Sequence, residues 1–236
     1  MKIRTFFLVW LAVFLLFGGA ASAAMAFDSE QEFNEWCMAY YRAPEPSLVP
    51  KAIGYAGSSG LIQDPAFREP LVAFFSTVIQ REPQYVEDWI RNLGAGETDL
   101  REFLMECLWR AEEEAMLNDM EMDASGEELR FVQRLYDQRR PEILADPLST
   151  AGHLDALWAV FFATGDPEPV SKIIDALSWT DEVEDLDRLL LGTVAQWSLT
   201  ANAKEHPRVA DICRKELPNR NGVIREKLEQ VLDEAQ

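Results

Sequence analysis

Apolar residues recur along the chain at the spacing of one face of an α-helix. Phe33, Trp36, Cys37 and Tyr40 fall at positions i, i+3, i+4 and i+7, which predicts an amphipathic helix, and the alternation expected of a half-buried strand does not recur. The chain is therefore predicted to be all-α. Four further stretches share the helical spacing: Phe67, Leu71, Phe74, Phe75, Val78 and Ile79; Leu100, Phe103, Leu104, Cys107, Leu108 and Ala111; Leu154, Leu157, Trp158, Phe161 and Phe162; and Leu186, Leu189, Leu190, Val194 and Trp197.

Helix starts are marked by capping residues and by proline. At 29–32 and at 125–128 a serine is followed three residues later by glutamate, the capping box that opens a helix. The Gly-Asp-Pro sequence at 165–167 predicts the end of one helix at glycine, then an N-cap and a first-turn proline. Pro46 and Pro83 indicate two more starts. The chain thus reads as long helices, each followed closely by a shorter one.

These helix pairs look like repeats of one unit. Residues 40–53 (YYRAPEPSLVPKAI) align without gaps to residues 161–174 (FFATGDPEPVSKII), with proline, valine, lysine and isoleucine at the same offsets. Tyr41, Phe75 and Trp109 also follow one another at intervals of 34 residues. A helical hairpin cannot bury its apolar stripe alone, whereas stacked hairpins bury a continuous core.

We therefore expect a right-handed stack of antiparallel helical hairpins, α-solenoid-like, with about 11 helices. The architecture resembles tetratricopeptide and HEAT solenoids. The tetratricopeptide pattern of Trp, Leu-Gly, Tyr, Ala and Pro is not met, so no residue role follows from the resemblance. The expected hairpins, with a closing helix at 221–236, are 29–57, 65–93, 99–138, 150–178 and 181–217.

The first 26 residues have the pattern of a secretory signal peptide. Lys2 and Arg4 precede an uncharged apolar run and a stretch of small residues, and cleavage is expected after Ala23 or Ala26. The alternative is an uncleaved membrane anchor, because the uncharged segment is long enough to cross a bilayer. We expect an exported protein, periplasmic or secreted, with one helical repeat domain at 27–236.

The composition and charge of the chain limit the classes of partner that it is expected to bind. Hydrophobic residues make up 48% of the chain and the net charge is −19, so the chain is expected to fold and to repel nucleic acid and anionic membranes. Beyond the N-terminal segment we expect no membrane association. The odd cysteine count, Cys37, Cys107 and Cys213, leaves at least one thiol unpaired, and all three lie at apolar positions typical of core residues.

Chemical motifs are scarce. The two histidines, His153 and His206, belong to no zinc or nucleophile motif, and we predict no catalytic residue, no metal ligand and no cofactor. Three alternatives stay open. A thiol–imidazole pair such as Cys37 with His153 is one; a calcium site in the acidic loop 118–126 is another, although the EF-hand spacing fails there. The third is Cu(I) bound by the methionines at 116, 120 and 122 beside Cys107.

Negative charge is concentrated in the middle of the sequence. Residues 97–128 contain twelve acidic and two basic residues, and a shorter acidic run follows at 181–187. We expect a non-catalytic protein that binds a protein or peptide partner, with a basic segment attracted by this charge. Alternatives are a small-ligand or metal binder and an enzyme whose site is not visible in sequence. The candidate binding residues are Glu112, Glu113, Asp119, Glu121 and Asp123.

Overall fold

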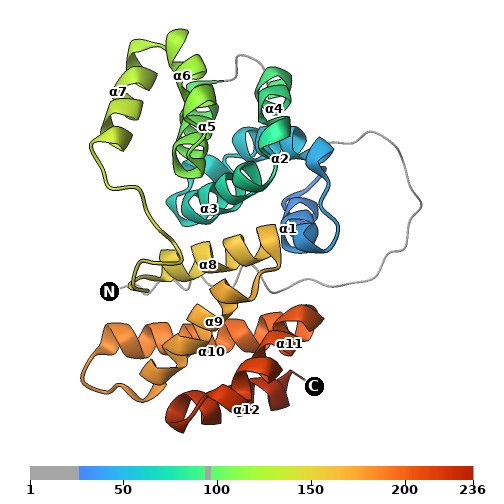
Figure 1. The fold of residues 1–236 in the computed structure, drawn as a ribbon, viewed down its shortest axis with the longest axis vertical. Coiled ribbons are helices and arrows are strands. Elements are labelled where there is room, and N and C mark those ends of the chain that lie inside the picture. Colours follow the sequence, from blue (N-terminus) through green and yellow to red (C-terminus); the bar gives the residue numbers. More distant parts are fainter. Residues whose placement is uncertain (1–26, 94–96, 236) are drawn as a thin grey trace.

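The computed structural model describes residues 27–93 and 97–235, and within these ranges the chain forms twelve α-helices and no strand (Figure 1). The all-α prediction is confirmed. Short 3₁₀ turns lead into or out of several helices. The helices are α1 (Glu30–Ala39), α2 (Val49–Ser58), α3 (Pro65–Arg81), α4 (Val86–Leu93), α5 (Thr98–Ala111), α6 (Glu114–Met122), α7 (Gly126–Tyr136), α8 (Ala151–Thr164), α9 (Pro167–Asp175), α10 (Leu186–Glu205), α11 (Pro207–Glu216) and α12 (Gly222–Glu234).

Several predicted helix boundaries are confirmed by hydrogen bonds. Ser125 Oγ accepts from the backbone N–H of Glu128 at 3.3 Å, and Glu128 Oε2 accepts from the N–H of Ser125 at 2.6 Å, which completes the capping box. Gly165 ends α8 in the left-handed region at φ 70°, and Pro167 is the first residue of α9. Pro46 and Pro83 begin 3₁₀ turns that run directly into α2 and α4.

The centre of the molecule is the packing of α3 against α8, which is the most extensive contact between two described helices. In Figure 1, α8 lies across the middle, with α1 to α7 above it and α9 to α12 below it. Helix α5 packs on α3, and α1 also contacts α8. Phe75, Phe103, Leu157 and Phe161 are fully buried here, so one apolar core joins elements that are distant in the sequence.

The C-terminal helices stack in sequence order. Helix α8 packs on α9, α9 on α11, α10 on α11 and on α12. Order in the N-terminal part is different, because α2 packs against α4, α1 against α8, and α3 against both α5 and α8. A regular stack of five consecutive hairpins is therefore not confirmed for the whole chain. The physical reason is that an apolar stripe specifies that it will be buried but does not specify which helix will cover it.

The two segments that align in the sequence contact one another in the fold. The rings of Tyr41 and Phe161 lie 5.0 Å apart, and the left-handed Gly165 passes so close to Tyr41 that a Cβ built there would lie 2.9 Å from Tyr41 Cδ2. Tyr40 packs edge-on against Phe74 with 5.6 Å between ring centroids. The aromatic pairs of the proposed repeat thus form part of the core between elements.

The face that α10 buries differs from the prediction. Leu186, Leu190 and Trp197 were expected on the buried stripe, but they are 68%, 62% and 40% exposed. The buried face is formed instead by Leu191, Gly192, Ala195, Ser198 and Leu199. Small residues form much of this buried face because the backbone of the 3₁₀ segment Ala176–Asp181 passes against Gly192. A Cβ at Gly192 would lie 2.8 Å from the backbone nitrogen of Thr180. An apolar pattern alone could not show that close backbone approach.

The predicted signal peptide, residues 1–26, lies outside the described residues. Among the helices that are described, none combines the length and hydropathy needed to span a bilayer. Cys37, Cys107 and Cys213 are buried free thiols, in agreement with the core positions expected for them.

Candidate functional site

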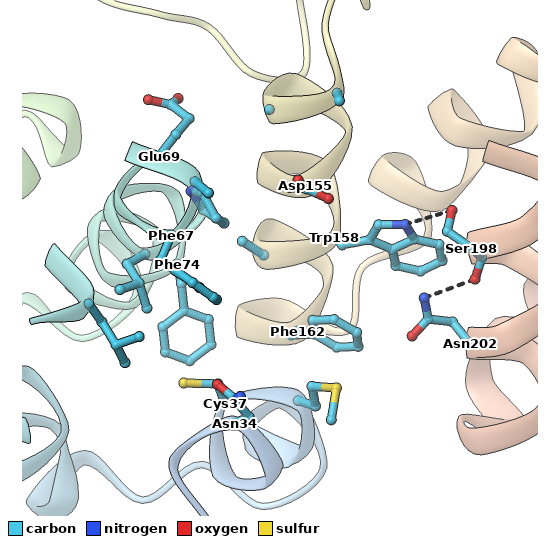
Figure 2. Close-up of a pocket in the computed structure, with 18 of the residues that line it drawn as sticks. Asn34, Cys37, Phe67, Glu69, Phe74, Asp155, Trp158, Phe162, Ser198 and Asn202 are labelled. Atoms are coloured by element: carbon cyan, nitrogen blue, oxygen red, sulfur yellow. Dashed lines mark hydrogen bonds between the residues drawn. The ribbon is translucent and has the colours of Figure 1, made fainter. Parts of the chain in front are cut away.

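An apolar cavity of about 460 Å³ lies between α1, α3, α8 and α10 (Figure 2). Each helix contributes side chains that recur at intervals of about one helical turn, so that one helical face forms one wall. The wall from α1, for example, is Phe33, Asn34, Cys37 and Met38. Lining residues from the other elements are Leu61, Pro65, Ala66, Phe67, Glu69, Pro70, Leu71, Phe74, Ala151, Gly152, Asp155, Trp158, Ala159, Phe162, Trp197, Ser198, Ala201, Asn202 and Glu205.

Six aromatic rings dominate the lining. Trp158 and Phe162, one helical turn apart on α8, are stacked with their ring centroids 5.9 Å apart and an interplanar angle of 23°. Figure 2 shows these two rings between α8 and α10. Rings of this size supply a large apolar contact area that loses little conformational freedom on binding. The other four rings belong to Phe33, Phe67, Phe74 and Trp197.

Hydrogen bonds fix the wall between α8 and α10. Trp158 Nε1 donates to Ser198 Oγ at 3.1 Å, and Ser198 Oγ in turn donates to the carbonyl of Ala195 at 3.1 Å. Asn202 Nδ2 donates to the carbonyl of Ser198 at 2.9 Å, as Figure 2 shows. The amide oxygen Oδ1 of Asn202 therefore stays available as an acceptor at the cavity.

Asp155 places a carboxyl group among these apolar side chains. Burial raises its pKa from 3.8 to about 7, and it makes no hydrogen bond or ion pair with any residue that the structure describes. Desolvation is the cause, because an apolar environment disfavours the charged form. Near neutral pH the group therefore exists in both protonation states, and small changes at the cavity alter its charge.

Two further carboxylates line the cavity. Glu69 forms a bidentate pair with Arg110, with Oε1 and Oε2 at 2.7 and 2.8 Å from the two guanidinium nitrogens. Glu205 is exposed at the end of α10, and burial raises its pKa while the charge of Arg42 lowers it. Of the three carboxyl groups, Asp155 is thus the one whose charge no basic side chain nearby compensates.

Cys37, His153 and His206 carry the side chains that could act as nucleophiles or bases, and each is held by burial or by a hydrogen bond. Burial raises the pKa of the Cys37 thiol far above its usual range, so it stays protonated and a poor nucleophile. His153 Nε2 lies 2.8 Å from the carbonyl of Ile143, and no hydrogen bond joins it to Cys37 in the described structure. His206 accepts from Arg42 Nη2 through Nδ1 at 2.8 Å, and burial together with Arg42 lowers its pKa to about 4.

The acidic residues singled out in the sequence lie apart from the cavity, on the α5–α7 end of the molecule. Several are already neutralised within the protein: Glu112 pairs with Arg140 at 3.2 Å, and Asp123 pairs with Arg101 at 3.2 Å. Tyr136 donates a hydrogen bond to Glu121. Glu113 is half-buried at the start of α6 and Asp119 is exposed. A partner that binds these residues remains a prediction.

No described group of three or more His, Cys, Asp or Glu side chains is placed to hold a metal ion. Met120 and Cys107 are buried in the core, whereas Met122 is 80% exposed, so the thioethers and the thiol considered for copper do not share one environment. The oxygen ligands considered for calcium are divided between α6, the 123–125 connection and the capping box of α7.

One feature of the sequence indicates the cavity. Asp155 is the single acidic residue in the stretch 151–164, which is otherwise almost wholly apolar. It lies at i−3 and i−7 from Trp158 and Phe162, on the same helical face. A carboxyl group inside a helix that is apolar on all sides indicates either a partner in the core or a polar position in a cavity.

Comparison with known proteins finds no relative: no protein-family model, no curated protein and no solved structure matches the chain. Function is therefore inferred from the cavity and its residues.

Proposed function

We propose that the protein binds a small, mainly apolar organic molecule in the cavity between α1, α3, α8 and α10. The observation that carries the proposal is the cavity itself, about 460 Å³ in volume and lined by six aromatic rings with a few polar groups between them. Sites for small molecules have this size and character, with an apolar lining for affinity and isolated polar groups for orientation.

The size of the cavity sets the ligand class. A molecule that buries on the order of 200 Å² of apolar surface there gains roughly 5 kcal/mol from its removal from water. A gain of about 5 kcal/mol corresponds to a Kd of roughly 0.2 mM, and it is retained only if the walls need little reorganisation. The Trp158–Ser198 hydrogen bond at 3.1 Å holds two of the walls in place before any ligand arrives, which supports binding to a preformed site.

Binding, and not covalent catalysis, fits the chemistry of the lining. The thiol at the cavity, Cys37, is held in its protonated form by burial. No histidine lines the cavity among the residues described, so the imidazole that activates most thiol and hydroxyl nucleophiles is not present in this wall.

A fluorescence titration tests the proposal. N-phenyl-1-naphthylamine, a neutral apolar dye that becomes bright out of water, is titrated into the protein, and the emission of tryptophans, including Trp158 and Trp197 in the lining, is followed as an energy donor. Ala66→Trp narrows the cavity, because Ala66 is an exposed residue on its lining. Ala145→Trp is the matched control, since Ala145 is also exposed but lies outside the cavity.

The expected result is saturable dye binding that Ala66→Trp weakens at least about tenfold and Ala145→Trp leaves unchanged, a difference of about 1.4 kcal/mol. Absence of saturable binding by the unmodified protein, or equal affinity in both variants, refutes the proposal.

A further inference from the structure

The charged groups at the cavity are all of one sign. Asp155, Glu69 and Glu205 line it, and none of the lining residues within the described chain is a lysine, arginine or histidine. Both oxygens of Glu69 accept from Arg110 in a bidentate pair, and Figure 2 shows the Glu69 carboxylate turned away from the ring of Phe74, which leaves Asp155 and Glu205 as the carboxyl groups without such a pair. A ligand in the cavity therefore meets carboxylates and no cationic side chain.

The uncharged polar groups of the lining add more acceptors. Pro70 lies inside α3 and has no N–H, so the carbonyl of Ala66, four residues earlier, lacks its helical donor at this turn. Both residues line the cavity. Asn202 uses its NH₂ group to bond Ser198, which leaves Oδ1 as the remaining acceptor. These groups add hydrogen-bond acceptors to the lining, beside the amide groups of Asn34 and Asn202, which can also donate.

The aromatic rings of the lining also favour a cation. The face of an aromatic ring carries negative potential and attracts a cation that lies over it, most strongly when the cation has left water. Trp158 and Phe162 stack beside one another, and Asp155 lies one turn before Trp158 on the same helix. Aromatic rings grouped around a pocket are the arrangement that proteins use to hold quaternary ammonium groups.

We infer that the ligand is an organic cation, an apolar body that carries an amine or quaternary ammonium group placed near Asp155. The inference rests on the proposed function and specifies the ligand class of that same cavity. It excludes fatty acids and other organic anions, whose carboxylate would face Asp155 and Glu205 with no basic partner. The net charge of −19 also raises the concentration of cations around the protein.

Burial raises the pKa of Asp155. A cation beside the carboxylate stabilises its charged form, so binding lowers the pKa and releases a proton when it occurs below about pH 7. Glu69 and Glu205 are the other acidic groups that line the cavity, and Arg110 and Arg42 are the nearby basic groups acting on them.

The test uses four probes with the same ten-carbon chain: decylamine, decyltrimethylammonium, decanol and decanoate, each below its micelle concentration. Each probe displaces N-phenyl-1-naphthylamine from the full-length protein at pH 8 and about 0.15 M salt, which screens charge beyond about 8 Å. The variants are Asp155→Asn, which is nearly the same size, and Asp233→Asn, which removes one exposed charge on α12 outside the cavity.

The expected result is that both ammonium compounds bind at least about tenfold more tightly than decanol, and that decanoate binds most weakly. Asp155→Asn should remove most of the ammonium preference and leave decanol affinity unchanged, and Asp233→Asn should behave as the unmodified protein. Decanoate binding as tightly as decylamine, or an ammonium preference that survives in Asp155→Asn, overturns the cation inference while the small-molecule function stands. If no probe binds, both proposals fall.

Discussion

Trp158 Nε1 donates a hydrogen bond of 3.1 Å to Ser198 Oγ, and both residues are about 95% buried. This bond joins α8 to α10 across 40 residues of sequence and fixes the orientation of an indole ring that lines the cavity. A buried N–H that loses its acceptor retains the full cost of its desolvation.

Ser198→Ala is therefore expected to destabilise the protein by about 1–3 kcal/mol. Urea unfolding followed by circular dichroism measures the change. Ser58→Ala is the control, because Ser58 is exposed and its hydroxyl bonds only to the carbonyl of Tyr55 in its own helix. Equal stability of the two variants would show that the Trp158 hydrogen bond contributes nothing.

Gly165 and Gly222 allow the cost of backbone strain to be separated from the cost of a steric clash. Both have positive φ, 70° and 53°, but a Cβ at Gly165 would lie 2.9 Å from Tyr41 whereas nothing lies within 4 Å of one at Gly222. Gly222→Ala should cost about 1–2 kcal/mol from backbone strain alone. Gly165→Ala should cost more, because the added Cβ also meets Tyr41. Adding Tyr41→Ala to that variant should remove this additional cost. Thermal unfolding of Gly222→Ala, Gly165→Ala, Tyr41→Ala and the double variant measures the differences.

Asp155 and His206 are predicted to affect the pH dependence of stability in opposite directions. The pKa of Asp155 is raised from 3.8 to about 7, so the folded state binds the extra proton between these values and its contribution to stability falls as pH rises. The pKa of His206 is lowered from 6.5 to about 4, so the unfolded state binds the extra proton there and stability rises with pH. Each slope is at most about 1.4 kcal/mol per pH unit.

Between pH 4 and 6.5 the two slopes largely cancel, and single variants should reveal them. Stability of Asp155→Asn should rise more steeply with pH than that of the unmodified protein, and stability of His206→Gln should rise less steeply. Urea unfolding at half-unit pH intervals gives the slopes. Parallel curves for all three proteins would contradict the burial of both groups.

Leu190 and Leu191 should respond differently to the same substitution. Leu190 is 62% exposed and Leu191 is 9% exposed. Leu190→Gln is expected to change stability by less than about 0.5 kcal/mol, whereas Leu191→Gln should cost about 2–4 kcal/mol through lost packing and a buried amide. A larger cost for Leu190→Gln than for Leu191→Gln would instead support the buried face of α10 that the apolar pattern predicted.

Local features of the fold could be predicted from the sequence, because their causes are local. The Ser125–Glu128 capping box and the Gly165–Pro167 boundary depend on neighbouring residues, and each appears where the sequence placed it. The pairing of α3 with α8 could not be predicted. Their apolar stripes are suited to many partners, and the choice depends on how all the helices fit together at once.

The cavity could not be predicted from the sequence for the same reason. Asp155 was visible as an acidic residue in an apolar stretch, but the space around it arises from faces of α1, α3, α8 and α10 that meet only in the folded chain. The net charge along the sequence is most negative around residues 112–123 instead, which lie outside the cavity. Arg140, which lies outside the segment that was counted, pairs with Glu112, and a count along the sequence does not reveal this pair.

The cavity is bounded by residues from Phe33 to Glu205, so a ribosome must synthesise most of the polypeptide before its last wall exists. A nascent chain that stops before α10 has the aromatic side chains of α3 and α8 but no Ser198 to receive the indole of Trp158. A chain that ends before Glu205 cannot complete the cavity, so occupancy by the proposed ligand would report that α10 has been synthesised and has packed against α8.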